Sequence, residues 1–236
     1  MDSAAKAQRA PVIVAIDGPA GTGKSSTSRA VAARLGLRYL DTGAQYRAAA
    51  WWMLGNGVDV ADAAAIAAAA EKPQIVSGTD PGAPTIAVDG ADAAGPIRTQ
   101  EVTAAVSAVS AVPEVRTRIT ALQRSIAAQS VKSGGIVVEG RDIGTTVLPD
   151  ADVKIFLTAS EEVRAARRSG ELKGKDARDL AATQASLARR DAADSGRKVS
   201  PLAKAGDATE VDTTELTLEQ VIQYVVSLVE EKQQGR

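Results

Sequence analysis

The sequence contains no cysteine and no histidine, and its single asparagine is Asn56. Without cysteine the chain has no disulfide, no thiolate nucleophile and no cysteine metal site. Without histidine it has no histidine general base and no histidine-ligated zinc. The N-K-x-D motif with which GTPases read their base is also absent. Chemistry must therefore rest on lysine, arginine, carboxylates and hydroxyl groups. These suffice for phosphoryl transfer, which depends on positioning and charge stabilisation.

The sequence also has a small net charge, few aromatic residues and only short apolar runs. The formal net charge is −1, and the 236 residues include two Trp, three Tyr and one Phe. This balance does not favour nucleic acid or an anionic membrane as a partner. No apolar run approaches the about 20 residues of a membrane span. Residues 1–10 lack the apolar core of a signal peptide, so we expect a disordered tail on a cytoplasmic protein.

A glycine-rich segment, GPAGTGKS at residues 18–25, fills the pattern G-x-x-x-x-G-K-[ST] without a mismatch. The apolar run at 12–16 predicts a buried strand before it, and residues 25–35 predict a helix after it, which is the context of a phosphate-binding loop (P-loop). Backbone N–H groups and the helix N-terminus would bind phosphates, Lys24 would add a charge, and the Ser25 hydroxyl would bind Mg²⁺. The predicted ATP-binding residues are Gly18, Pro19, Ala20, Gly21, Thr22, Gly23, Lys24, Ser25 and Ser26.

Strand and helix patterns alternate along the rest of the chain. Strands are expected at 38–40, 136–139, 153–158 and 210–213, with helices between them, one of them reaching Arg197. This alternation predicts a three-layer α/β/α fold with a central parallel sheet, whose ligands lie beyond the carboxyl ends of the strands. The exception is an antiparallel hairpin expected at 74–77 and 85–88, followed by a turn at 89–92.

Several arginines belong to elements that could face the carboxyl edge of this sheet. Any one of them alone would most simply be a solvated position on a helix. Arg141 differs, because it follows a buried strand and a glycine, where a cation requires an anionic partner. Arg167 and Arg168 precede a polar stretch at 170–179, which suggests a lid that closes over phosphates and excludes water.

Five segments together resemble the bacterial cytidylate kinase family. They are AIDGPAG at 15–21, LDTGAQYR at 40–47, IRTQEV at 97–102, GRDIGT at 140–145 and VKIFL at 153–157. The first is shared by many unrelated enzymes, whereas the other four in this order are far more specific. The resemblance extends from about Pro11 to the last helix. One departure is Glu139, which stands where the family commonly has aspartate.

The resemblance implies transfer of the γ-phosphoryl group of ATP to CMP or dCMP, giving CDP or dCDP and ADP. It also implies substrate-binding roles for Thr42, Arg47, Ser107, Arg116, Arg141, Asp142, Arg190, Asp194 and Arg197. The implied catalytic residues are Lys24, Arg141, Arg167, Arg168 and Arg190. Ser107, Arg116 and Asp142 would read cytosine. A carboxylate facing the cytosine amino group would repel the carbonyl that uracil carries there.

The implied domain organisation is a disordered tail at 1–10 and a core of residues 11–73, 98–162 and 186–236. A β insert at 74–97 would bind the nucleoside monophosphate, and a short helical lid would span 163–185. We expect a monomer, because no exposed apolar stripe is left over. Two alternatives stay open: a P-loop kinase acting on a hydroxyl, with Asp41 or Asp142 as base, and a nucleotide-dependent switch or hydrolase. The product, CDP or free phosphate, would distinguish them.

Overall fold

The structure, a computed structural model, describes residues 10–171 and 180–235. The expected disordered tail lies outside the described residues except for Ala10. Most of the polar stretch expected in the lid, residues 172–179, lies outside them too.

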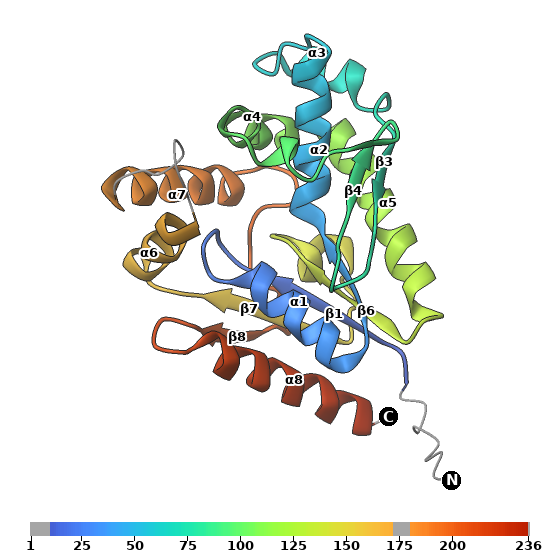
Figure 1. Ribbon diagram of the computed structural model, residues 1–236, viewed down its shortest axis with the longest axis vertical. Coiled ribbons are helices and arrows are strands. Elements are labelled where there is room, and N and C mark those ends of the chain that lie inside the picture. The colour runs from blue at the N-terminus through green and yellow to red at the C-terminus, as the bar shows by residue number, and fades with distance from the viewer. Residues whose placement is uncertain (1–9, 172–179, 236) are drawn as a thin grey trace.

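A five-stranded sheet forms the centre of the fold, in the order β2-β6-β1-β7-β8 (Figure 1). Its strands are β1 (Val12–Asp17), β2 (Arg38–Asp41), β6 (Gly135–Glu139), β7 (Val153–Thr158) and β8 (Thr209–Asp212). Every neighbouring pair is parallel. The central strands are runs of β-branched residues buried on both faces, as parallel sheets require. The predicted parallel sheet is therefore confirmed, and the carboxyl ends of its strands meet at one edge.

Helices cover both faces of this sheet. One face packs against α1 (Lys24–Leu35) and α8 (Leu218–Gln234) in an apolar cluster that includes Val14, Val137 and Val225. The other face packs against α5 (Pro113–Val131) and η2 (Ile143–Val147), a short π-helical segment that the sequence did not indicate. The three-layer α/β/α prediction is confirmed.

A second apolar core lies beyond the carboxyl edge of the sheet. It joins α2 (Thr42–Gly55), α3 (Ala63–Ala69), η1 (Pro96–Arg98) and α4 (Gln100–Ala111) to a small antiparallel sheet. That sheet contains the predicted hairpin, β3 (Ile75–Ser77) and β4 (Ile86–Val88). The turn predicted at 89–92 is confirmed at Asp89 and Gly90, which have positive φ, whereas Ala91 and Asp92 form β5 (Ala91–Asp92), which pairs with β4.

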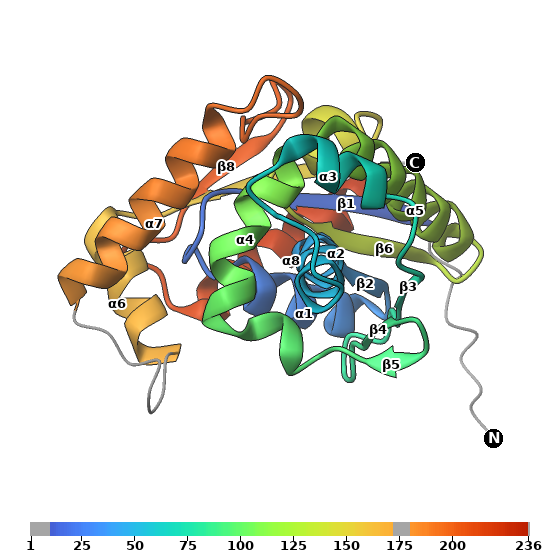
Figure 2. The ribbon, with the colours of Figure 1, turned by 90° about the horizontal axis from the view of Figure 1, so that it is seen from above.

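Two helices, α6 (Glu161–Glu171) and α7 (Leu180–Ser195), lie side by side and flank the edge of the sheet (Figure 2). Ala165 of α6 and Leu187 of α7 pack on Ala20 of the phosphate loop. The expectation that the second helix reaches Arg197 is wrong, because α7 ends at Ser195, before Gly196, and glycine is a poor helix former.

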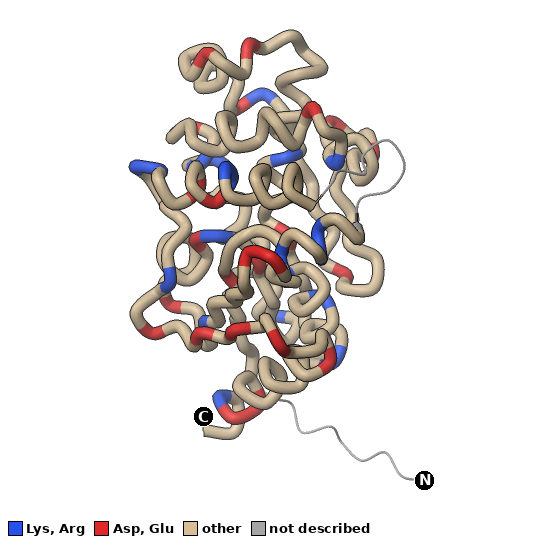
Figure 3. The backbone as a smooth tube through the Cα atoms, turned by 90° about the vertical axis from the view of Figure 1, so that its left-hand side faces the viewer, with Lys and Arg blue, Asp and Glu red and all other residues tan. Residues whose placement is uncertain are grey.

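Charged residues of both signs alternate over the part of the chain that the structure describes, and no large region belongs to one sign (Figure 3). Among the described helices, none combines the length and the apolar character that crossing a bilayer would take.

Candidate nucleotide site

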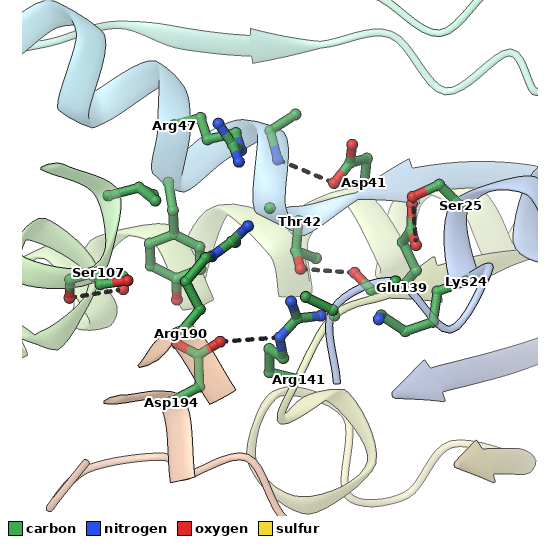
Figure 4. A pocket seen from close by; sticks show the side chains of 18 of the residues that line it. Lys24, Ser25, Asp41, Thr42, Arg47, Ser107, Glu139, Arg141, Arg190 and Asp194 are labelled. Atoms are coloured by element: carbon green, nitrogen blue, oxygen red, sulfur yellow. Dashed lines mark hydrogen bonds and ion pairs between the residues drawn. The ribbon is translucent and has the colours of Figure 1, made fainter. Parts of the chain in front are cut away.

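A cavity of about 230 Å³ lies at the carboxyl edge of the five-stranded sheet (Figure 4). Most of the predicted site residues line it: Ala20, Gly21, Gly23, Lys24, Ser25, Ser26, Thr42, Arg47, Ser107, Arg116, Arg141, Asp142, Arg168, Arg190, Asp194 and Arg197. Lining residues that the sequence analysis did not assign include Tyr46, Arg98, Ser110, Glu139 and Leu187. Segments far apart in the sequence thus converge as the topology of the sheet requires.

The phosphate loop connects β1 to α1, and its shape depends on glycine. Gly18 has φ +145°, and a Cβ there would lie 2.1 Å from the carbonyl oxygen of Leu157. Lys24 begins α1, is buried, and its Nζ donates to the carbonyl of Pro19 at 2.5 Å. Burial, followed by repulsion from Arg141, holds the pKa of Lys24 below its usual value. An anion beside Lys24 would offset both effects.

The carboxylate of Glu139, at the end of β6, lies between two hydroxyl groups. Ser25 Oγ donates to its Oε2 at 3.0 Å, and Tyr39 OH donates to its Oε1. Burial, followed by the charge of Asp41, raises the pKa of Glu139 to about 7. Burial also raises the pKa of Tyr39, so that its phenol stays protonated. Sequence reasoning missed Tyr39, because its contact with Glu139 depends on the pairing of β2 with β6.

Asp17 closes β1 below the loop and is almost fully buried. Its two oxygens accept from the backbone N–H groups of Ile143 at 2.9 Å and Gly144 at 2.8 Å, which fixes the start of η2. Burial raises the pKa of Asp17 to about 6, while the two backbone hydrogen bonds act in the opposite direction.

One end of the cavity contains a buried ion pair between Arg116 of α5 and Asp142. Their side chains are 3% and 6% exposed. Arg116 also donates to the carbonyl of Ser110 at 3.1 Å, and its guanidinium carbon lies 5.2 Å from the centre of the Tyr46 ring. Together with Ser107, this end offers a carboxylate, a guanidinium and a hydroxyl, which are the hydrogen-bonding groups predicted to read cytosine.

A second carboxylate, that of Asp194, lies between two arginines. Its Oδ2 accepts from Arg141 Nε at 3.0 Å, and its Oδ1 lies 3.7 Å from Arg197 NH2. Arg141 also donates to the carbonyl of Gly18 at 2.9 Å, which ties it to the phosphate loop. Figure 4 shows Arg141 and Arg190 reaching into the same space.

The cavity holds more cationic groups than its carboxylates can neutralise. Burial lowers the pKa of Arg190 and of Arg197, and it lowers the pKa of Arg47 to about 10, which leaves Arg47 charged at neutral pH. Within the described part of the chain, Arg190 Nε and Arg197 NH2 are buried without a hydrogen-bond partner. Arg47 donates to Ile97 O at 3.1 Å and to Thr103 Oγ1 at 2.9 Å. Such a cluster suits a polyanionic ligand.

The arginines of α6 have different neighbours. Arg168 lines the cavity, whereas Arg167 donates to Thr213 Oγ1 at 2.9 Å and to Thr213 O at 2.7 Å, at the end of β8. Gly18, Pro19, Thr22 and Arg167 are the predicted site residues that the structure does not bring to the wall of the cavity. Sequence reasoning missed the contact of Arg164 with Asp191, which links α6 and α7.

Comparison with known proteins identifies the family. The family model described as cytidylate kinase matches residues 14–231. The cytidylate kinase of Streptomyces griseus is 75% identical over 98% of both chains, and that of Streptomyces coelicolor is 72% identical over 100% of both. A gluconokinase from Sinorhizobium meliloti superposes with a TM-score of 0.50 at 13% identity, covering 96% of both chains, which shows a shared fold alone. Because the family model and these relatives span nearly the whole sequence, the chain belongs to the cytidylate kinase family of P-loop kinases.

Proposed function

We propose that this chain transfers the γ-phosphoryl group of ATP to CMP or dCMP, giving CDP or dCDP and ADP. The observation that carries the proposal is the cavity itself. A phosphate loop and a cluster of arginines share one space with a buried guanidinium–carboxylate pair of the chemistry that cytosine requires. The names of the relatives give the same substrate class.

The phosphate loop would hold the donor. Its backbone N–H groups and Lys24 would bind the phosphates of ATP. The Ser25 hydroxyl and the Glu139 carboxylate, 3.0 Å apart, offer the oxygen ligands that Mg²⁺ prefers, directly or through water. The residues thus fit the metal, which when bound neutralises charge on the β- and γ-phosphates.

The arginine cluster would hold the acceptor. Arg47, Arg141 and Arg190 would bind the monophosphate and the transferring group, and Asp194 would accept a hydrogen bond from the sugar. A phosphate oxygen of CMP attacks the γ-phosphorus of ATP while the bond to the β–γ bridging oxygen breaks and ADP leaves. The attacking oxygen is already anionic, so no general base is needed. The arginines stabilise the charge that spreads over the γ-oxygens.

The buried pair would read the base. Asp142 would accept from the exocyclic amino group of cytosine, and Arg116 with Ser107 would donate to N3 and O2. Uracil carries a carbonyl where cytosine carries the amino group, so that UMP would leave the Asp142 carboxylate facing an acceptor. Buried mismatches of this kind discriminate strongly between substrates.

Initial rates with ATP on CMP, dCMP, UMP, AMP and TMP test this proposal. We expect CMP and dCMP to be used and UMP to be poor. A clear preference for AMP or TMP would refute it. A hydroxyl acceptor is less compatible with the site, because Asp142 is paired with Arg116 and Asp41 accepts from the backbone of Ala44 at 3.0 Å, which leaves neither as a ready base. A hydrolase would release free phosphate without CDP.

The lid, the domain boundaries, the monomeric state and the cytoplasmic location stay predictions. The lid role would fall to α6 and α7, through Arg168 and Arg190. Arg167 could contribute only if it exchanged its contacts with Thr213 for the nucleotide. Multi-angle light scattering tests the monomer, and cell fractionation tests the location.

A further inference from the structure

The carboxylate of Glu139 is held from both sides by hydroxyl groups of different elements. Ser25 donates to one oxygen from the start of α1, and Tyr39 donates to the other from β2. Tyr39 is paired in register with Val137, two residues before Glu139, so that both side chains project from the same face of the sheet. Tyr39 and Glu139 are 2% and 3% exposed.

The direction of the Ser25 hydrogen matters for metal binding. A serine hydroxyl has one hydrogen and two lone pairs, and it can ligate a cation only when the hydrogen points elsewhere. Glu139 Oε2 accepts that hydrogen at an oxygen–oxygen distance of 3.0 Å. A carboxylate that rotated away would release the hydroxyl to other acceptors. Outer partners that orient a ligand in this way control metal affinity.

Two contacts hold Glu139 in this position. Thr42 Oγ1 donates to the main-chain oxygen of Glu139 at 2.7 Å, which fixes its backbone, while Tyr39 holds the side chain. The Tyr39 ring belongs to the apolar cluster on the α1 face of the sheet. A phenylalanine would fill that space equally well. The hydroxyl is therefore the part of the residue that packing does not explain, and Glu139 is its hydrogen-bond partner.

We propose that Tyr39 is a positioning residue for the metal–nucleotide complex, acting through Glu139 on the Ser25 hydroxyl. The proposal rests on the proposed use of Mg²⁺ with ATP, and Tyr39 itself touches neither substrate nor metal. Its role is to keep one carboxylate rotamer, so that Ser25 presents a lone pair to the cation.

Isothermal titration calorimetry with ADP tests this role when it is run once in EDTA and once in saturating Mg²⁺. The ratio of the two association constants is the factor by which Mg²⁺ strengthens ADP binding, which we call the metal-dependent gain. In Tyr39→Phe we expect that gain to fall about fivefold to tenfold, near the lower end for outer-sphere partners. The affinities for metal-free ADP and for CMP should not change. Tyr46→Phe removes another buried hydroxyl and should leave the gain intact. Tyr224→Phe changes a side chain on the solvent-facing side of α8 and should leave activity intact.

A double-mutant cycle with Ser25→Ala shows whether Tyr39 acts through Ser25. If it does, Tyr39→Phe has no further effect on the gain once the serine hydroxyl is gone. A gain that is unchanged in Tyr39→Phe, with only the melting temperature lowered, would overturn the proposal, as would effects that add in the double variant. Should Tyr39→Phe fail to fold, Glu139→Gln substitutes for it, and an unchanged gain there is equally fatal. The measurement uses no acceptor, so its failure is separate from a failure of the CMP assignment.

Discussion

Replacing Asp142 by asparagine removes one charge of a buried ion pair and leaves Arg116 without its counterion. Breaking such a pair from one side typically costs about 3–5 kcal/mol. Here Arg116 keeps its hydrogen bond to Ser110 O at 3.1 Å and its position 5.2 Å from the Tyr46 ring. Both contacts are present before and after the substitution, so they do not offset the loss, but the asparagine oxygen can still accept a hydrogen bond from Arg116. We therefore expect Asp142→Asn to lower the free energy of unfolding by about 3 kcal/mol, the lower end of this range.

Urea unfolding without ligand measures this loss. With a slope of about 2–3 kcal/mol per molar for a chain of this size, the midpoint should fall by about 1 M. The matched control is Glu219→Gln, which breaks the pair that Arg34 makes at 2.6 Å with side chains 42% and 52% exposed. Exposed pairs contribute little, so its midpoint should not move. Equal falls in the urea midpoint of the two variants would refute the argument that the buried pair contributes more to stability than the exposed one.

The same variant tests the reading of the base. Asparagine can turn its amide N–H₂ toward the uracil carbonyl, which the carboxylate cannot do. The ratio of kcat/KM for CMP over that for UMP should therefore fall by at least about 10²-fold. Initial rates with both nucleotides, measured at a temperature where the variant is fully folded, give this ratio. An unchanged ratio would mean that Asp142 stabilises Arg116 without facing the base.

Three further predictions follow from the same contacts. Arg141→Ala should lower kcat by about 10²–10³-fold with an unchanged far-UV CD spectrum, because Arg197 still neutralises Asp194; a collapsed spectrum would make Arg141 structural. Because the pKa of Asp17 rises to about 6 on folding from its usual 3.8, the native state binds the extra proton, and this group's contribution to stability should fall by roughly 2 kcal/mol as pH rises from 4 to 7. The pH dependence of the unfolding free energy of Asp17→Asn should be shallower by this amount, and parallel curves for the two proteins would contradict the assignment. Gly18→Ala should destabilise far more than Gly23→Ala, since the new Cβ meets a carbonyl only at Gly18, and the strain of a left-handed residue alone costs about 1–2 kcal/mol; equal melting temperatures would contradict this.

The sheet and the phosphate loop could be predicted from the sequence because each depends on a short local sequence pattern. Continuous apolar runs rich in β-branched residues, such as 12–16 and 136–138, favour a strand buried on both faces. The loop motif places glycines where the backbone needs positive φ, directly before the first turn of a helix. The convergence of Lys24, Arg141 and Asp142 followed from one topological rule, that parallel strands end at one edge. Short elements escaped prediction, because two residues of β5 or five residues of η2 contain too little periodicity to read.

Side-chain direction was the harder part, because it depends on neighbours distant in sequence. Tyr39 reads as an ordinary strand residue until β6 is placed beside it, and only then does its hydroxyl meet Glu139. Similarly, Arg164 is an ordinary helical arginine until α7 brings Asp191 next to it. In both cases the functional group of the side chain could be read from the sequence, and only the structure shows the residue with which it pairs.

The two arginines assigned to the lid show how far helical geometry could have narrowed the prediction. Adjacent residues on a helix project about 100° apart, so that Arg167 and Arg168 start in different directions from α6. Residues four apart share a face, and Arg164 and Arg168 do lie on the side of α6 nearer the phosphate loop and the cavity, where Arg164 donates to Ala20 O at 3.1 Å. Arg167 instead binds the end of β8. The 3.6-residue period therefore predicts that one arginine of the pair lies nearer the cavity than the other, and the packing of α6 on Ala20 shows that this one is Arg168.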